Sequence, residues 1–142
     1  MDDRDQFLSS TIPRQVRADT SLHNGDAAPR REMWSRNDPV TLFGAAQERT
    51  GWDDVSRTFD WLASIFSDCT AFDLELVAAD VHGDLAYTVG YENTTASVEG
   101  AQQSYRLRVT HIYRRENGEW KIVHRHADPL GRFNLPPVPG KR

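Results

Sequence analysis

Three side chains in the second half of the sequence carry the groups used in acid/base chemistry. Glu92 ends the stretch AYTVGYE, which is otherwise uncharged, and His111 and Arg125 lie in two later segments that alternate apolar and polar residues. In one interpretation Glu92 is a general base or orients a ligand, while Arg125 binds a carboxylate or enolate oxygen and His111 exchanges protons. In the other, they form a structural ion pair or a solvated sheet edge, because an unpaired buried carboxylate would be costly.

Two further histidines raise the question of a metal site. His124 and His126 are two residues apart, which places both imidazoles on one face of a strand. With His111 they supply ligands that zinc accepts, but no carboxylate is clearly placed to complete the set. The sequence therefore predicts no metal, and histidines that are packed or interfacial. No Gly-rich phosphate loop is present either, so we expect no organic cofactor.

The pattern of elements that must position these residues predicts an α+β domain. We expect a flexible polar N-terminus over residues 1–10 and a helix from about Thr11, because Pro13 is tolerated in a first turn. A short helix over 27–34 and a strand over 40–44 should follow. Apolar residues spaced three and four apart, with Phe59 and Leu62 at the centre, predict an amphipathic helix over 51–67. Alternation with period two then predicts antiparallel strands up to residue 127, ahead of a Pro-rich tail over 131–142.

Composition excludes several classes of protein. The chain has 142 residues, a length typical of one domain, and a net charge of −4, which argues against nucleic-acid binding. The single cysteine, Cys69, excludes a disulfide framework, and its surroundings offer nothing that would activate it. No apolar run is long enough to span a membrane. The acidic N-terminus has no signal-peptide core, so the expected compartment is the cytoplasm.

Three segments resemble the NTF2-like superfamily. They are GWDDV at the start of the long helix, GDLAYTVGYE in mid-sheet, and LRVTHIYRRENGEWKIVHRHADP at the end. The sequence is most similar to SnoaL-like and DUF4440-type members and to the calmodulin-dependent kinase II association domain, over about residues 10–130. The resemblance implies a cone in which a curved sheet wraps a long helix, a pocket at the open end, and a homodimer formed through the convex sheet face.

The turn of the last hairpin decides which side chains face that pocket. A two-residue turn at Asn117-Gly118 would place His111 beside His124, and a three-residue turn that begins at Glu116 would place it near Arg125. Both are chemically possible. The resemblance favours the second, because arginines of the kinase association domain match the positions of Glu92 and His111. Trp120 and Ile122 would then cover the convex face with Leu85, Tyr87, Val89, Tyr91, His124 and His126.

The candidate site follows from this choice of turn. Glu92, His111 and Arg125 are the expected catalytic residues, and the expected substrate-binding residues are Trp34, Thr88, Tyr105, Val123, His126 and Asp128. Four of them have an ordinary structural alternative: core packing for Trp34 and Tyr105, an intramolecular salt bridge for Arg125, and a strand-end cap for Asp128. His126, at the end of its strand, would still reach the pocket rim.

The resemblance implies a range of functions, from isomerases, cyclases and dehydratases to non-catalytic hub domains. Ketosteroid isomerases carry their catalytic aspartate in the strand before the long helix, where this sequence has Phe43, so that reaction is not expected. We expect a pocket that binds a small molecule and performs acid/base chemistry on an apolar carbonyl compound without a cofactor. The alternative is a non-catalytic ligand-binding or oligomerisation module.

Overall fold

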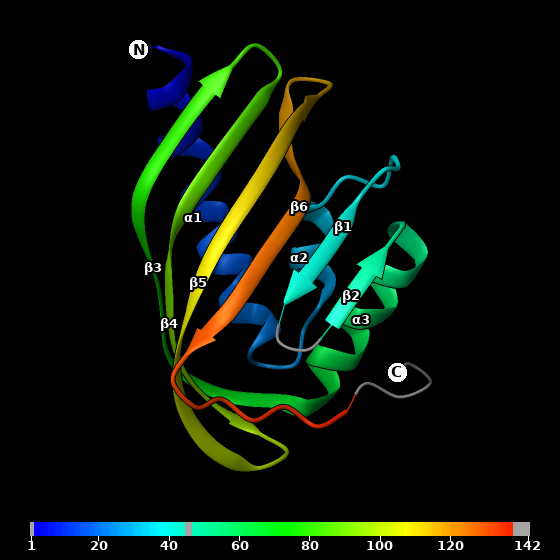
Figure 1. Cartoon of the computed structure of the whole chain (residues 1–142), viewed down its shortest axis with the longest axis vertical. Helices are drawn as coiled ribbons and strands as arrows, with labels where there is room; N and C mark the ends of the chain where they lie inside the picture. The colour runs from blue at the N-terminus through cyan, green and yellow to red at the C-terminus, as the bar shows by residue number, and fades with distance from the viewer. Residues whose placement is uncertain (1, 45–46, 138–142) are drawn as a thin grey trace.

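A computed structural model describes residues 2–44 and 47–137, which form three helices and one six-stranded sheet (Figure 1). The elements run in the order α1 (Asp3–Leu22), α2 (Ala28–Met33), β1 (Thr41–Gly44), β2 (Gln47–Thr50), α3 (Trp52–Ile65), β3 (Phe66–His82), β4 (Leu85–Val98), β5 (Ala101–Glu116) and β6 (Glu119–Leu130). The sheet order is β2-β1-β6-β5-β4-β3, with a parallel β1–β6 pair and antiparallel pairs elsewhere. The predicted α+β cone is confirmed.

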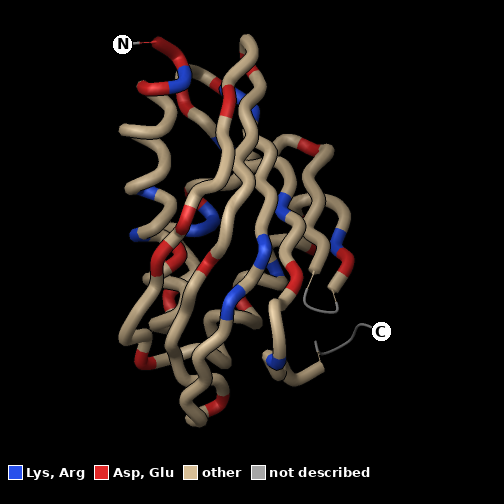
Figure 2. Tube along the Cα trace, turned by 60° about the vertical axis from the view of Figure 1, so that its left-hand side comes forward, with Lys and Arg blue, Asp and Glu red and all other residues tan. Residues whose placement is uncertain are grey.

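The sheet curves over the helices, which lie against its inner face (Figure 1). Charges of both signs are spread over the traces rather than gathered on one element (Figure 2). None of the helices in the described residues has the length and apolar composition needed to cross a bilayer. The sequence did not predict the strand β2, because this strand has only four residues, Gln47–Thr50.

The first helix begins earlier than expected. The predicted start near Thr11 is wrong, because α1 begins at Asp3 and Pro13 lies inside it. Residues 3–10, expected to be flexible, are therefore helical. The side chain of Asp2 caps this start by accepting the Asp5 N–H at 2.8 Å. Phe7 is fully buried, with its ring 4.8 Å from that of Tyr113, so apolar burial stabilises the turns before the proline.

The long helix α3 follows the predicted apolar stripe. Val55 and Phe59 are fully buried, and Phe59 meets the ring of Trp34 edge-on at 5.2 Å. The helix starts after Gly51, whose φ of 91° favours glycine, and the carboxylate of Asp38 accepts the N–H of Trp52 at 2.9 Å. The helix thus holds one wall of the space beneath the sheet.

The last hairpin has the two-residue turn that the resemblance disfavoured. Asn117 and Gly118 both have positive φ, as in a type I′ turn, and Glu116 pairs with Glu119. Trp120 and Ile122 consequently face the core, so their predicted place on the convex face is wrong.

A β-bulge then changes the register further along the same pair of strands. The pairing shifts between Ile112, which is opposite His124, and Tyr113, which is opposite Ile122, so Val123 is the extra residue. His111 is therefore opposite Arg125, and both point inward. His111 and Arg125 are neighbours as expected, but a two-residue turn with a bulge brings them together instead of a three-residue turn.

The described residues after β6 form no strand or helix. Residues 131–137 cross towards α3 beneath the sheet (Figure 1). Phe133 and Leu135 pack on a core cluster that includes Leu107 and Val109. The rest of the predicted Pro-rich tail, residues 138–142, lies outside the described residues.

Candidate functional site

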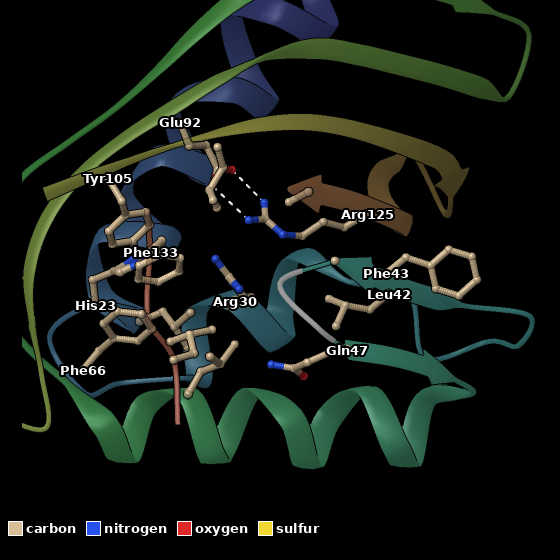
Figure 3. A pocket seen from close by; sticks show the side chains of 16 residues that line it. His23, Arg30, Leu42, Phe43, Gln47, Phe66, Glu92, Tyr105, Arg125 and Phe133 are labelled. Carbon is tan, nitrogen blue, oxygen red and sulfur yellow. Dashed lines mark hydrogen bonds and ion pairs between the residues drawn. The ribbon is translucent and has the colours of Figure 1, made fainter. Parts of the chain in front are cut away.

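A pocket lies between the inner face of the sheet and the helices (Figure 3). It holds about 540 Å³ of space that no protein atom fills, counting its open mouth. Only about 60 Å³ of this space admits the centre of a water-sized sphere, so the interior is narrow with the present side chains in place. Most of its wall is apolar, and the apolar lining residues are Leu22, Leu42, Phe43, Leu62, Phe66, Leu107, Ala127, Phe133 and Leu135. Polar groups enter from α1, α2, β2, β4, β5 and β6.

Glu92 and Arg125 form a bidentate ion pair in the wall of this pocket. The Arg125 Nη1 donates to Glu92 Oε2 at 2.7 Å, and its Nη2 donates to Oε1 at 2.9 Å. Burial alone would raise the pKa of Glu92, but the charge and hydrogen bonds of Arg125 outweigh it and lower that pKa to about 2. A carboxylate with this pKa and both oxygens bound is a poor base. Its role here is to hold the guanidinium in place.

His111 lies behind this pair rather than in the pocket wall. Its Nε2 accepts from Arg125 Nη1 at 3.2 Å, so the proton of the neutral ring is on Nδ1. Among the described residues Nδ1 has no acceptor. Burial, followed by the nearby Arg125 charge, lowers the pKa of His111 to about 3. The imidazole is therefore neutral and orients Arg125.

A second buried ion pair joins α1 to α2. The Arg30 Nε donates to the Oδ1 of Asp19 at 3.0 Å, and its Nη2 is 2.9 Å from the same oxygen. Burial raises the pKa of Asp19, against the opposing effect of Arg30, while that of Glu92 is lowered. Figure 3 shows the Arg30 head group in the pocket, between the Glu92–Arg125 pair and Gln47. Two guanidinium groups thus line the pocket, each partly neutralised by a carboxylate.

His23 and Tyr105 form a hydrogen-bonded pair at the other end of the pocket (Figure 3). The His23 Nδ1 is 2.7 Å from the backbone oxygen of Asp19, and a carbonyl oxygen only accepts, so Nδ1 carries the proton. His23 Nε2, 2.8 Å from the Tyr105 hydroxyl, must then accept the phenolic proton. Burial, followed by the Arg30 charge, lowers the pKa of His23 to about 4, and burial raises the pKa of Tyr105.

This pair can transfer a proton although both side chains are neutral in the resting protein. The Tyr105 oxygen can take a proton from a bound molecule while its own proton passes to His23 Nε2, and the reverse transfer returns it. Arg30 and Arg125 can stabilise negative charge that develops on a ligand oxygen in the same pocket. The mostly apolar wall strengthens these interactions because it lowers the local dielectric. The arrangement fits acid/base chemistry on a neutral, partly apolar molecule.

The structure brings some of the candidate residues together and leaves others elsewhere. Glu92, Arg125 and Tyr105 line the pocket, with His111 behind Arg125. Of the rest, Trp34 packs in the core against Phe59, and Thr88 is buried beside the Tyr113 hydroxyl.

The remaining three candidates lie away from the pocket because of the bulge and the strand alternation. Val123 is the bulged residue and packs against the core cluster, half-buried. His126 is exposed on the outer sheet face, its ring centroid 6.0 Å from that of Phe43. Asp128 is on the same face, where its Oδ2 accepts from Arg108 Nη2 at 2.7 Å. Phe43, at the position that the isomerase aspartate would occupy, is itself 37% exposed.

Sequence reasoning missed the polar contributions of the first two helices. Thr11, Gln15, Asp19 and His23 are four residues apart and all buried, so they form one inward-facing polar stripe along α1. That spacing was a readable signal for buried polar groups. The contact of His23 with Tyr105 spans 82 residues, and nothing in the local sequence indicated it. Within the described residues, no three His, Cys, Asp or Glu side chains gather to hold a metal ion.

Comparisons with known proteins agree with this architecture. A sequence profile of the SnoaL-like domain matches residues 17–129. No curated protein is significantly similar in sequence. Among solved structures, a provisionally assigned dehydratase of the NTF2-like family from Streptomyces avermitilis superposes with a TM-score of 0.70 at 19% identity, over 87% of this chain and 99% of that one.

Two other solved structures have the same fold. A ketosteroid isomerase-like protein from Erwinia carotovora gives a TM-score of 0.71 at 14% identity, over 89% of this chain and 98% of that one. A provisionally assigned calcium/calmodulin-dependent protein kinase II association domain from Thiobacillus denitrificans gives 0.59 at 19% identity, over 89% and 91%. At these identities the similarity establishes the fold alone.

Proposed function

The chain belongs to the SnoaL-like domain family, and on this premise we propose that its pocket binds a small, largely apolar carbonyl compound and catalyses a proton transfer within it. Isomerisation, cyclisation and dehydration all begin in this way, by removing a proton next to a carbonyl group. Two solved structures with this fold are described as a dehydratase and as ketosteroid isomerase-like, and dehydration and isomerisation are both reactions of this kind. The proposed step uses only side chains of this chain.

The observation that carries the proposal is the His23–Tyr105 pair. Its hydrogen bond of 2.8 Å leads from the phenol to the unprotonated Nε2 of the neutral His23 imidazole. In the proposed step, the substrate C–H bond breaks, its proton goes to the Tyr105 oxygen, and the phenolic proton moves to His23 Nε2. The electron pair left on carbon delocalises to the carbonyl oxygen as an enolate, near Arg30 or Arg125.

This assignment differs from the one expected from the sequence, in which Glu92 is the base. Because Arg125 binds both oxygens of Glu92, that carboxylate instead supports the oxyanion-stabilising guanidinium. Glu92→Gln is then expected to weaken ligand binding and turnover together, through the position of Arg125. Tyr105→Phe, which removes the proton-transferring hydroxyl and keeps the ring, is expected to abolish turnover alone.

Proton exchange with solvent tests the proposal without knowledge of the product. The protein is incubated in D₂O with a panel of aryl ketones and β-hydroxy ketones, and loss of the α-proton signal is followed by ¹H NMR. Wild type should accelerate exchange of at least one compound, and Tyr105→Phe should slow it by about a hundredfold or more. Tyr91→Phe, at a tyrosine on the outer sheet face, is the matched control. Exchange at the wild-type rate by Tyr105→Phe would overturn the proposed role.

A second candidate function is a non-catalytic ligand-binding module. It is favoured by the ion pairs within the protein, because they leave neither carboxylate of the site, Glu92 or Asp19, free to act as a base. Both carboxylates next to the pocket are bound by arginines, and Glu92 has a pKa of only about 2. A binding module would be stabilised by its ligand and would show no exchange in any variant. The thermal shift of wild type, with and without each compound of the panel, measures that stabilisation, which is about 2.7 kcal/mol at a hundred times the dissociation constant.

We further propose that the chain forms a homodimer through the convex sheet face. Tyr87 and Ile112 are cross-strand neighbours at 41% and 37% exposure, and Ile112 is opposite His124. Leu85 and Val89 of β4 are exposed on the same face, and a second copy of the chain would cover these four apolar side chains. Light scattering should give about twice 16.2 kDa.

A charge among these four side chains should separate the proposed dimer. Ile112→Arg is expected to give a monomer, whereas Val77→Arg, at an exposed apolar residue of the edge strand β3, should leave the mass unchanged. A monomeric wild type at micromolar concentration would contradict the proposal.

A further inference from the structure

The chain that follows β6 covers part of the pocket. We call residues 131–137 the C-terminal strap. After Leu130 it turns under the sheet and runs towards α3 (Figure 1). Two of its side chains, Phe133 and Leu135, belong to the pocket lining. The strap thus closes a space whose other walls come from the helices and the sheet.

Phe133 lies flat against the tyrosine of the proton-transfer pair. The two ring centroids are 3.6 Å apart with an interplanar angle of 14°, a stacked arrangement. At this separation no other ring fits between them. A planar group of a ligand therefore cannot stack on this face of Tyr105 while Phe133 is in place. Figure 3 shows Phe133 beside Tyr105 and His23, at the same end of the pocket.

The strap is attached by few interactions. The Gln103 side-chain nitrogen donates to the backbone oxygen of Asn134 at 3.0 Å, and the Asn134 N–H donates to Gln103 Oε1 at 3.3 Å. Both hydrogen bonds are exposed, and the strap contains no helix or strand. Gly131, Arg132 and Asn134 are exposed, and Phe133 is only half-buried. Segments with such contacts open at a small fraction of the free energy of global unfolding.

We propose that the strap is a displaceable cover, and that Phe133 occupies the subsite for a planar aromatic ring of the ligand. The proposal rests on the proposed function, since it identifies part of the molecule that the pocket binds. Displacing Phe133 exposes the Tyr105 ring for stacking and brings a ligand carbonyl within reach of the Tyr105 hydroxyl. The ligand class is then an aromatic or conjugated carbonyl compound whose ring replaces that of Phe133.

The cover lowers the apparent affinity of the pocket. When only a fraction of molecules is open, the apparent dissociation constant is the intrinsic constant divided by that fraction. A strap that is open about a tenth of the time therefore weakens binding about tenfold. Changes that loosen the strap should tighten binding, although they remove contacts from the protein.

Fluorescence titration with 1-anilinonaphthalene-8-sulfonate, a probe with fused aromatic rings and an anionic group, tests this. Phe133→Ala empties the subsite, and Gln103→Ala removes both strap hydrogen bonds while leaving every pocket-lining side chain unchanged. Each should bind the probe about three to ten times more tightly than wild type. Gln102→Ala, the same change at the adjacent exposed residue of β5, is the control and should bind as wild type. Circular dichroism establishes that all four proteins are folded.

A second readout locates the event at the strap. With 4-fluorophenylalanine in place of Phe133, the ¹⁹F resonance should move to its solvent-exposed value when the probe saturates the protein. A resonance that stays at its stacked value with the probe bound overturns the displacement.

The titration separates failure of the strap proposal from failure of the pocket. If the probe binds wild type, Phe133→Ala and Gln103→Ala equally, or binds the variants more weakly, Phe133 is a fixed wall and the strap proposal is overturned while the pocket stands. If no protein in the series binds the probe saturably, the pocket as a small-molecule site is overturned, and the strap proposal with it.

Discussion

Substitutions of Glu92 and Arg125, singly and together, test whether these two buried charges stabilise each other. Glu92→Gln keeps the shape of that side chain and removes its charge, and Arg125→Met keeps an apolar stem. The side chains are 2% and 11% exposed, so solvent screens them little. Each single change leaves the other charge buried without its main partner.

The expected magnitudes follow from this burial. Removing one partner of a buried ion pair costs about 3–5 kcal/mol, a large part of a typical stability of about 5–15 kcal/mol. The double variant buries no unpaired charge, so it should be less destabilised than the sum of the two single variants. The difference, the coupling free energy, should be about 2–3 kcal/mol, at the upper end for residues in contact.

Urea unfolding of the wild type, both single variants and the double variant gives this coupling directly. The matched control is Arg108 with Asp128, also bidentate, which joins the neighbouring strands β5 and β6 on the outer face. Those side chains are 57% and 48% exposed, and a screened pair of this kind should show additive effects. Additive effects at Glu92 and Arg125 as well would refute the reasoning, because they would mean that the two charges are solvated independently.

Three further changes probe other parts of the account. Phe59→Ala should lower the free energy of unfolding by about 3–5 kcal/mol, since Phe59 is fully buried beneath the sheet, and a melting temperature within two degrees of wild type would contradict its place in the core. Gly90→Ala should destabilise by about 1–3 kcal/mol in urea unfolding, because a Cβ there would collide with the Glu75 carbonyl of β3; unchanged stability would refute this close strand contact. Between pH 7.5 and 5.5 wild type should lose about 1.4 kcal/mol more stability than His111→Gln, because the unfolded imidazole, with a pKa of 6.5, takes up a proton that the folded one, with a pKa of about 3, does not. Equal pH dependence of the two proteins would show that His111 is not held neutral.

The fold could be predicted from the sequence because its main patterns are local. The stripe that includes Val55 and Phe59 marked α3, and alternation marked the long strands. The register of the last hairpin could not be predicted in the same way, because a bulge at Val123 shifts the pairing that the two-residue turn sets. The three-residue turn that the resemblance favoured therefore gave the wrong face for Trp120 and Ile122, although it gave the right neighbour, Arg125, for His111.

The candidate site was only partly predictable for a related reason. Glu92 and Arg125 lie on long strands whose alternation places them inside. His23 and Phe133 reach the pocket from a helix end and from an irregular segment, and both meet Tyr105 through contacts between residues distant in the sequence. Patterns with a period of two or of three to four describe faces of regular elements, and they carry no information on such contacts.

The state of the His23 imidazole tests the central claim most directly. Its ¹⁵N chemical shifts can be followed between pH 4 and 8 in long-range ¹H–¹⁵N correlation spectra and assigned with His23→Gln. The account predicts a neutral ring with the proton on Nδ1 at pH 7, a pKa of about 4, and an Nε2 shift that changes in Tyr105→Phe, where the phenolic donor is gone. A ring with the proton on Nε2 would contradict the account, because His23 could not then accept the Tyr105 proton, and a ring that titrates near pH 6.5 would contradict its burial beside Arg30.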